Sequence, residues 1–156
     1  MTTLSQAPFL LVEDNERDID LMRRAFSRLQ LGNPFHVVRD GEEAMDYLLG
    51  QGLYANREEF PLPFLILLDI HLPKRDGFEV LQWLRKTPGL KHILVVVLSG
   101  REDDADIQRA YALGANSYLI KPGDPAHLQE MIGLLQKYWT TINRIVEFRQ
   151  RASEAA

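Results

Sequence analysis

The fold is decided by the stretch Phe9-Leu10-Leu11-Val12-Glu13-Asp14, a short apolar run that ends on two acidic residues. The pattern recurs in Leu65-Ile66-Leu67-Leu68-Asp69, and in Tyr118-Leu119-Ile120-Lys121 the apolar run ends on a cation. Short runs of leucine and β-branched residues are typical of strands buried on both faces of a parallel sheet. Parallel strands bring their carboxyl ends to one edge, where open α/β sheets place their binding sites. The sequence therefore predicts that three carboxylates and one ammonium converge at that edge.

The composition is that of one globular domain and excludes several classes of function. The 156 residues include 18 Lys and Arg against 22 Asp and Glu, which gives a net charge of −4. A mildly acidic chain without a basic stripe argues against nucleic acid as a partner. The absence of cysteine excludes disulfides, thiol catalysis and thiolate metal sites. The sequence has neither a membrane-length apolar segment nor a leader pattern, so we expect no membrane association and a cytoplasmic location.

Apolar strand patterns alternate with helical patterns along the chain. Strands are predicted at residues 9–12, 35–39, 64–68, 93–98 and 117–120, and helical spacing of apolar residues follows each of them. Strict alternation gives a parallel sheet with right-handed crossovers and helices on both faces. We therefore predict a doubly wound α/β fold whose five strands take the flavodoxin-like order 2-1-3-4-5. Its first and third strands are neighbours, about 4.8 Å apart, so the acids that follow them can share a cation.

The residues at this edge are the parts that phosphoryl transfer onto an aspartate requires. A cluster of carboxylate oxygens suits a hard divalent cation, Mg²⁺ before Mn²⁺. Lys121 can hold a phosphoryl oxygen as a point charge, and Ser99 adds a hydroxyl at the end of the fourth predicted strand. Aspartate is a known carboxylate nucleophile, and phosphoryl transfer depends mainly on positioning and charge neutralisation.

Several motifs in a fixed order are similar to those of the receiver domain of two-component response regulators. They are Glu13-Asp14, then Leu67-Leu68-Asp69-Ile70-His71-Leu72-Pro73 with Asp76-Gly77, then Ser99, and then Tyr118 with Lys121-Pro122. The resemblance covers residues 8–135. Each motif alone is weak evidence, whereas the ordered set on a βα scaffold is specific.

The resemblance implies a metal site and a phosphoacceptor. Asp69 would accept the phosphoryl group, Asp14 would bind Mg²⁺ directly, and Glu13 would bind it through water. The backbone carbonyl of His71 would complete the set of ligands. Glu13 departs from the commoner pair of aspartates, but it keeps the charge and should keep metal binding.

The resemblance also implies a switch. Lys121 would bind the phosphoryl group, and its bond to Pro122 would be cis. Ser99 would move toward the phosphoryl group, and Tyr118 would turn into the space that Ser99 leaves. Phosphorylation adds charge and acceptor oxygens at Asp69, and this pair would convert the addition into a changed surface.

The resemblance further implies partners. A histidine kinase would supply the phosphoryl group, and the receiver would catalyse its own phosphotransfer and dephosphorylation without being an enzyme. A finer resemblance points to receivers that partner phytochrome-type histidine kinases, carried by the long connection 51–63, by Leu72-Pro73-Lys74 and by Tyr138-Trp139. Residues 138–156 have room for one helix only, so we expect a stand-alone regulator. Its output would be a protein contact or onward transfer to a histidine phosphotransfer protein.

The last helical pattern extends past the sheet. Apolar residues keep alternating spacings of four and three up to Val146, which predicts an extended C-terminal helix over 126–151, about 39 Å long at 1.5 Å per residue. The sheet cannot cover such a helix, so we expect a homodimer that buries Trp139, Ile142 and Val146. The expected division is an N-terminal tail at 1–7, the receiver at 8–137 and a C-terminal helical extension at 138–156.

Other interpretations of the same residues stay open. The pair Glu13-Asp14 could be a helix start signal with Asp14 or Asn15 as the cap, and Tyr118 could be ordinary strand packing. A receiver-like domain that takes no phosphate would act as a docking module independent of phosphorylation. A Mg²⁺-dependent phosphatase with an aspartyl-phosphate intermediate would need an acid two residues after its nucleophile, where His71 stands.

Overall fold

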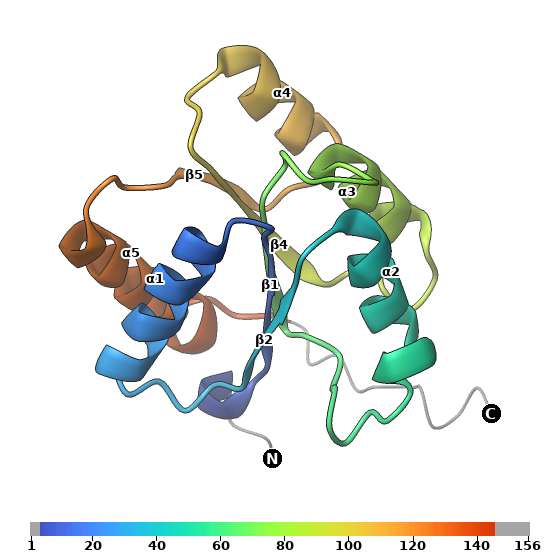
Figure 1. Cartoon of the computed structure of the whole chain (residues 1–156), viewed down its shortest axis with the longest axis horizontal. Coiled ribbons are helices and arrows are strands. Elements are labelled where there is room, and N and C mark those ends of the chain that lie inside the picture. The colour runs from blue at the N-terminus through green and yellow to red at the C-terminus, as the bar shows by residue number, and fades with distance from the viewer. Residues whose placement is uncertain (1–3, 146–156) are drawn as a thin grey trace.

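A five-stranded parallel sheet forms the centre of the protein (Figure 1). The structure, a computed structural model, describes residues 4–145. The strand order is β2-β1-β3-β4-β5, as predicted. The strands are β1 (Phe9–Val12), β2 (Phe35–Val38), β3 (Leu65–Leu68), β4 (Leu94–Ser99) and β5 (Ser117–Ile120).

Five helices cover the two faces of the sheet. They are α1 (Glu16–Arg28), α2 (Gly41–Leu49), α3 (Gly77–Lys86), α4 (Asp104–Ala112) and α5 (Pro125–Lys137). Helices α1 and α5 lie together on one face, and α2, α3 and α4 lie on the other (Figure 1). Short 3₁₀ turns occur at Leu4–Gln6 and Gly52–Tyr54, and a π-helical turn at Tyr138–Ile142 follows α5.

The neighbouring central strands β1 and β3 are apolar at every position because each face of the sheet has its own core. Phe9 and Leu11 pack with α1 and α5, whereas Leu10 and Val12 pack with the helices of the other face. All four residues are at most 1% exposed. This two-sided burial explains why the sequence shows continuous apolar runs instead of an alternating pattern.

The long connection between α2 and β3 is packed onto the fold. The guanidinium group of Arg57 donates hydrogen bonds to the carbonyls of Tyr47 and Leu48, both at 2.7 Å, and to that of Phe60 at 3.1 Å. Two of these carbonyls belong to the last turn of α2, where backbone acceptors lack partners within the helix. The ring of Phe60 also packs edge-on against Tyr54, with centroids 5.1 Å apart. The connection is therefore an ordered part of the domain that packs against α2.

The C-terminal helix is present, but it is shorter than the apolar spacing predicts. Regular α-helix ends at Lys137, and the chain becomes extended at Asn143, with φ −70° and ψ 142°. The hydroxyl of Thr140 donates to the carbonyl of Gln136 at 2.6 Å, and such side-chain bonds compete with the helical pattern. Val146 lies outside the described residues. Among the described helices, none is long and apolar enough to cross a membrane.

Candidate functional site

Three strand ends meet at the carboxyl edge of the sheet. Glu13 begins the acidic pair that follows β1, Asp69 follows β3, and Lys121 follows β5. The register aligns Val12 with Leu68, so the acids that come after these two residues are neighbours. The convergence predicted from the three apolar runs is therefore present.

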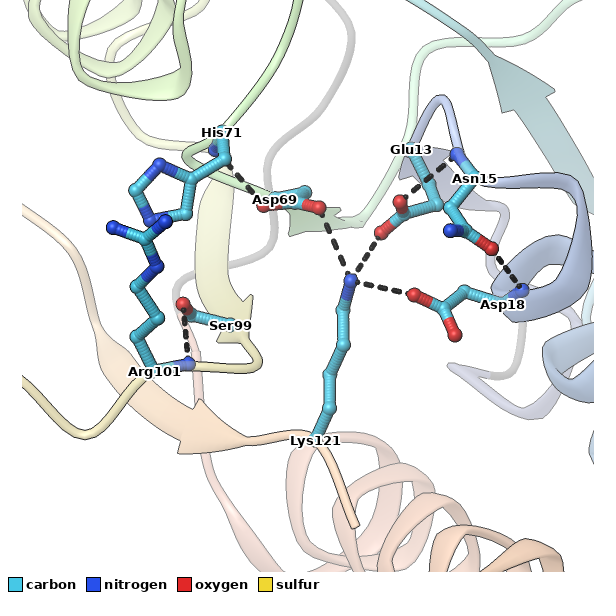
Figure 2. Close-up of polar contacts among 8 residues, drawn as sticks. All are labelled: Glu13, Asn15, Asp18, Asp69, His71, Ser99, Arg101 and Lys121. Atoms are coloured by element: carbon cyan, nitrogen blue, oxygen red, sulfur yellow. Dashed lines mark hydrogen bonds and ion pairs between the residues drawn. The ribbon is translucent and has the colours of Figure 1, made fainter. Parts of the chain in front are cut away.

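The Lys121 ammonium contacts three carboxylates (Figure 2). Its Nζ lies 2.6 Å from Glu13 Oε2, 3.0 Å from Asp18 Oδ2 and 3.1 Å from Asp69 Oδ2. Lysine has three N–H donors, so these bonds use all of them. The Glu13 and Asp69 side chains are only 2% and 9% exposed, and charges buried to this depth require a partner. We call Glu13, Asp18, Asp69 and Lys121 the Lys121 network.

Asn15 ties this network to the start of α1. Its backbone N–H donates to Glu13 Oε1 at 3.1 Å, and its side-chain oxygen accepts from the N–H of Asp18 at 3.0 Å. Asn15 is therefore the residue that caps the helix. With the bonds from Lys121 to Glu13 and Asp18, these contacts form a closed ring that runs from β1 through α1 to β5 (Figure 2).

The carboxylate of Asp69 is fixed from two sides. The backbone N–H of His71 donates to its Oδ1 at 2.9 Å, and Lys121 binds its Oδ2. The loop after β3 folds closely against the start of α3, because a Cβ added to Gly77 would lie 2.5 Å from the Asp69 carbonyl oxygen. Only glycine fits there, and the close approach helps to hold the loop in place.

Burial and neighbouring charge shift two ionisation equilibria in the network. Burial is the main cause that raises the pKa of Glu13 to about 7, Asp69 adds to the shift, and the hydrogen bond from Lys121 opposes it. Burial would lower the pKa of Lys121, but the bond to Glu13 and the charge of Asp69 outweigh it and raise that pKa. The ammonium therefore stays charged, and Glu13 exchanges its proton near neutral pH.

Three acids of this edge form a group that fits a divalent cation. Glu13, Asp14 and Asp69 each offer a carboxylate oxygen, and these oxygens lie within 4.8 Å of one another. We call these three residues the metal cluster. Glu13 and Asp69 are buried and Asp14 is exposed, so the group has an inner wall and a side open to solvent. An all-oxygen donor set with a net negative charge suits a hard cation of the Mg²⁺ or Mn²⁺ type.

Ser99 and Tyr118, which we call the switch pair, are joined through one residue. The buried Oγ of Ser99 accepts a hydrogen bond from the N–H of Arg101 at 3.1 Å. The hydroxyl of Tyr118 donates to the carbonyl of Arg101 at 3.0 Å, and its half-buried ring packs against the core on the face of α2, α3 and α4. Ser99 lies on the opposite side of the Lys121 side chain from Asp18 (Figure 2).

The family model of the response regulator receiver domain matches residues 9–133. The chain belongs to this family. The match covers all five strands of the receiver and the first part of α5.

Two relatives are similar to this chain over most of their own length. A probable methanogenesis regulatory protein, FilR2, of Methanothrix harundinacea is 42% identical over 143 residues, which are 90% of this chain and 89% of that protein. Response regulator Rcp1 of Synechocystis sp. is 38% identical over 130 residues, which are 83% of this chain and 86% of that protein.

Solved structures agree with this assignment. The phosphorylated cyanobacterial phytochrome response regulator RcpA superposes with a TM-score of 0.82 at 39% identity, over 89% of this chain and 97% of that one. The Mn²⁺-bound form of Rcp1 superposes with a TM-score of 0.79 at 36% identity, over 90% and 99% of the two chains.

The family assigns a kind of chemistry to this edge of the sheet. Receivers signal through a phosphorylated aspartate, have a histidine kinase as partner, bind a divalent metal and are not enzymes in the usual sense. The metal cluster of this receiver meets that requirement with three carboxylates.

Asp18 is the member of the Lys121 network that the sequence did not reveal. A polar residue in the first turn of a helix usually faces solvent, so it carries no signal by itself. Its spacing from Asp14 gives no clue either, because Asp14 lies before the Asn15 cap and outside α1. The structure places its carboxylate on Lys121.

The expected cis bond between Lys121 and Pro122 is wrong for this structure. All peptide bonds within residues 4–145 are trans. The trans form is the one that X–Pro bonds favour, and Lys121 reaches the three carboxylates of the network with it.

Proposed function

We propose that this receiver accepts a phosphoryl group from a histidine kinase onto Asp69, with Mg²⁺ in the metal cluster, and signals through a changed surface. The proposal rests on one observation above all. The carboxylate of Asp69 is buried and oriented by two bonds, and one of them comes from the ammonium of Lys121. A fixed nucleophile beside a fixed cation is the arrangement that phosphoryl transfer needs.

In the proposed transfer, an Asp69 carboxylate oxygen attacks the phosphorus of a phosphohistidine. The new P–O bond forms as the P–N bond breaks, and the leaving imidazole nitrogen keeps the electron pair. A bound Mg²⁺ would neutralise charge on the phosphoryl oxygens. Lys121 stabilises the same oxygens as a point charge, and the backbone N–H of His71 holds the carboxylate in place. In this proposal the backbone carbonyl of His71 is also a ligand of the metal.

The output step starts from a change in charge at Asp69. Phosphorylation replaces one negative charge by nearly two and adds acceptor oxygens. Ser99 can then turn its hydroxyl to the phosphoryl group, which removes the acceptor from the N–H of Arg101. Tyr118 is bonded to the carbonyl of the same residue, so a movement of Arg101 reaches the Tyr118 ring. Through this contact the switch pair would alter the surface around β4 and β5.

We further propose a phytochrome-type histidine kinase as the partner, and a histidine phosphotransfer protein as a recipient of the phosphoryl group. Support for the kinase comes from the phytochrome response regulator RcpA, at 39% identity with a TM-score of 0.82. The test is phosphotransfer from a purified phytochrome kinase compared with kinases of other sensor types. Equal rates from all of them would contradict this pairing.

The C-terminal segment supports a homodimer. Leu134, Tyr138 and Ile142 follow one another at four-residue spacing and are 63%, 46% and 59% exposed. Trp139 is half-buried on the core beside α5, so it offers only part of its ring. In this proposal residues 8–137 are the receiver, and residues 138–156 add Trp139, Ile142 and Val146 to the interface. Truncation after Lys137 should give a monomer by light scattering, and an unchanged mass would refute the interface.

The central experiment is phosphorylation of the purified protein by acetyl phosphate with Mg²⁺. Intact-mass spectrometry should detect one added phosphoryl group in the wild type and none in Asp69→Asn. Asp76→Asn is the matched control, because Asp76 lies in the same loop as an N-cap and asparagine caps equally well. Uptake that is unaffected by Asp69→Asn would overturn the proposal.

A further inference from the structure

Asp18 belongs to the Lys121 network but not to the metal cluster. Its Oδ2 lies 3.0 Å from Lys121 Nζ, and its side chain is 35% exposed. An acid in the first turn of a helix is favourable because of the helix dipole, and Glu16 meets the same condition in α1. Glu16, however, is paired with Arg39, and only Asp18 of these two reaches Lys121. The helix dipole therefore does not account for the contact.

The position of Asp18 is fixed at both of its ends. Its backbone N–H is held by the Asn15 cap, and its carboxylate is held by Lys121. Asn15 in turn is bonded to Glu13, which also accepts from Lys121, so the ring is closed. Bonds that constrain one another in this way keep a long side chain in one conformation, which a single exposed ion pair does not.

Asp18 is also the one acceptor that Lys121 does not share with the metal cluster. Glu13 and Asp69 are both members of that cluster, and a cation bound there would draw on the same carboxylate oxygens. Lys121 and a metal ion are both cationic, so they repel each other across the shared acids. The Asp18 carboxylate, which is not part of the metal cluster, offsets this repulsion and keeps the ammonium in place.

We propose that Asp18 is a positioning residue for the phosphoryl transfer, which holds the Lys121 ammonium beside Asp69 while the metal occupies the shared carboxylates. The inference rests on the proposed function of Asp69. Asp18 would then link α1 to the phosphoryl transfer through Lys121, and the other acidic residues of α1 would not take part. Without Asp18, the flexible stem of Lys121 keeps only the two acceptors for which the metal competes.

The test compares Asp18→Asn with Glu16→Gln, which removes the same charge from the same turn of α1 without touching Lys121. The first measurement is the ¹⁵N ammonium signal of Lys121 with Mg²⁺ and no phosphodonor. The chain has five lysines, and Lys121→Met assigns the signal. We expect the signal to broaden through faster hydrogen exchange in Asp18→Asn and to stay sharp in Glu16→Gln.

The second measurement is the rate of phosphorylation by acetyl phosphate at saturating Mg²⁺. We expect a fall on the order of threefold to tenfold in Asp18→Asn, the effect of losing one partly exposed charge-assisted bond, and none in Glu16→Gln. An unchanged Lys121 signal in Asp18→Asn would overturn the inference, and so would a broadened signal with an unchanged rate. The signal is recorded without phosphodonor, so a wild type that takes up no phosphate refutes the proposed function separately.

Discussion

The Lys121 network and the switch pair lie at the same edge of the sheet but are held in different ways. The network consists of charged groups that bond to one another, and its core members are buried. The switch pair is held by two neutral bonds, both to the backbone of Arg101. Charge-assisted bonds are roughly twice as strong as neutral ones, and a neutral bond contributes about 1 kcal/mol net. The residues of the Lys121 network are therefore held in a fixed arrangement for the chemistry. The residues of the switch pair are held weakly enough to rearrange for the output.

The largest effect should follow from breaking the network at its centre. Lys121→Ala leaves three carboxylates without their shared cation and removes the point charge that faces the transferred group. The phosphorylation rate with acetyl phosphate should fall by about 10²–10³-fold, as when one preorganised donor is removed from a transition state. Lys86→Ala, an exposed lysine of α3, is the control and should behave like the wild type. A Lys121→Ala protein phosphorylated at the wild-type rate would contradict the role of the network.

The second effect is a pH dependence of metal binding. It should arise from the Lys121 network and not from the switch pair. Burial, with a contribution from Asp69, raises the pKa of Glu13 to about 7, so below that pH a bound metal must displace a proton. The apparent Mg²⁺ affinity should fall by up to about tenfold per pH unit below 7 and level off above it. Calorimetric titrations at about pH 6 and about pH 8 measure the difference.

The same pKa shift makes a prediction for the metal-free protein. A carboxyl group whose pKa is higher in the folded state than in the unfolded chain stabilises the fold at low pH. That contribution is complete below the unfolded pKa of 4.5 and is lost as the pH rises through about 7. Glu13→Gln should remove both pH effects, and equal pH dependence in this variant would show that another group titrates.

A smaller effect is expected from the switch pair. Ser99→Ala removes one neutral bond to Arg101, worth about 1 kcal/mol, so phosphorylation should stay within roughly fivefold of the wild type. The change in the Tyr118 ring on phosphorylation should be lost, because alanine has no hydroxyl that could move from Arg101 to the phosphoryl group. The ring signals of Tyr118 in tyrosine-labelled protein, before and after phosphorylation, measure this. Ser99→Thr keeps the hydroxyl and should keep the response, and a full response in Ser99→Ala would argue against the coupling.

The two halves of the site also differ in how well the sequence predicts them. Glu13, Asp69 and Lys121 each follow an apolar run that forms a strand. Predicting the strands and their parallel order is therefore enough to predict that these three residues lie close together. The edge strand β2 was correctly expected in spite of its polar residues, because an edge strand is only partly buried. Asp18 was missed because it lies in the first turn of α1, where a polar residue usually faces solvent, and not directly after a strand.

Side-chain bonds to backbone carbonyls were beyond what the sequence pattern could predict. The Tyr118 hydroxyl is bonded to the carbonyl of Arg101, and the early end of the regular helix involves the bond from Thr140 to Gln136. Periodicity records which positions are apolar and contains no information on such bonds. The spacing of apolar residues up to Val146 therefore predicted a longer helix than α5.

The smallest effect isolates the second bond of the switch pair. Tyr118→Phe removes the hydroxyl that donates to Arg101, at a site partly open to water, so unfolding in urea should show a loss of less than about 1 kcal/mol. The amide signal of Arg101 should nevertheless shift, because its peptide group loses one of two anchors. Tyr111→Phe is the matched control, since the Tyr111 hydroxyl accepts from the Tyr118 backbone and does not touch Arg101. An Arg101 amide that shifts equally in both variants would mean that the aromatic packing, and not the hydroxyl bond, holds the switch pair.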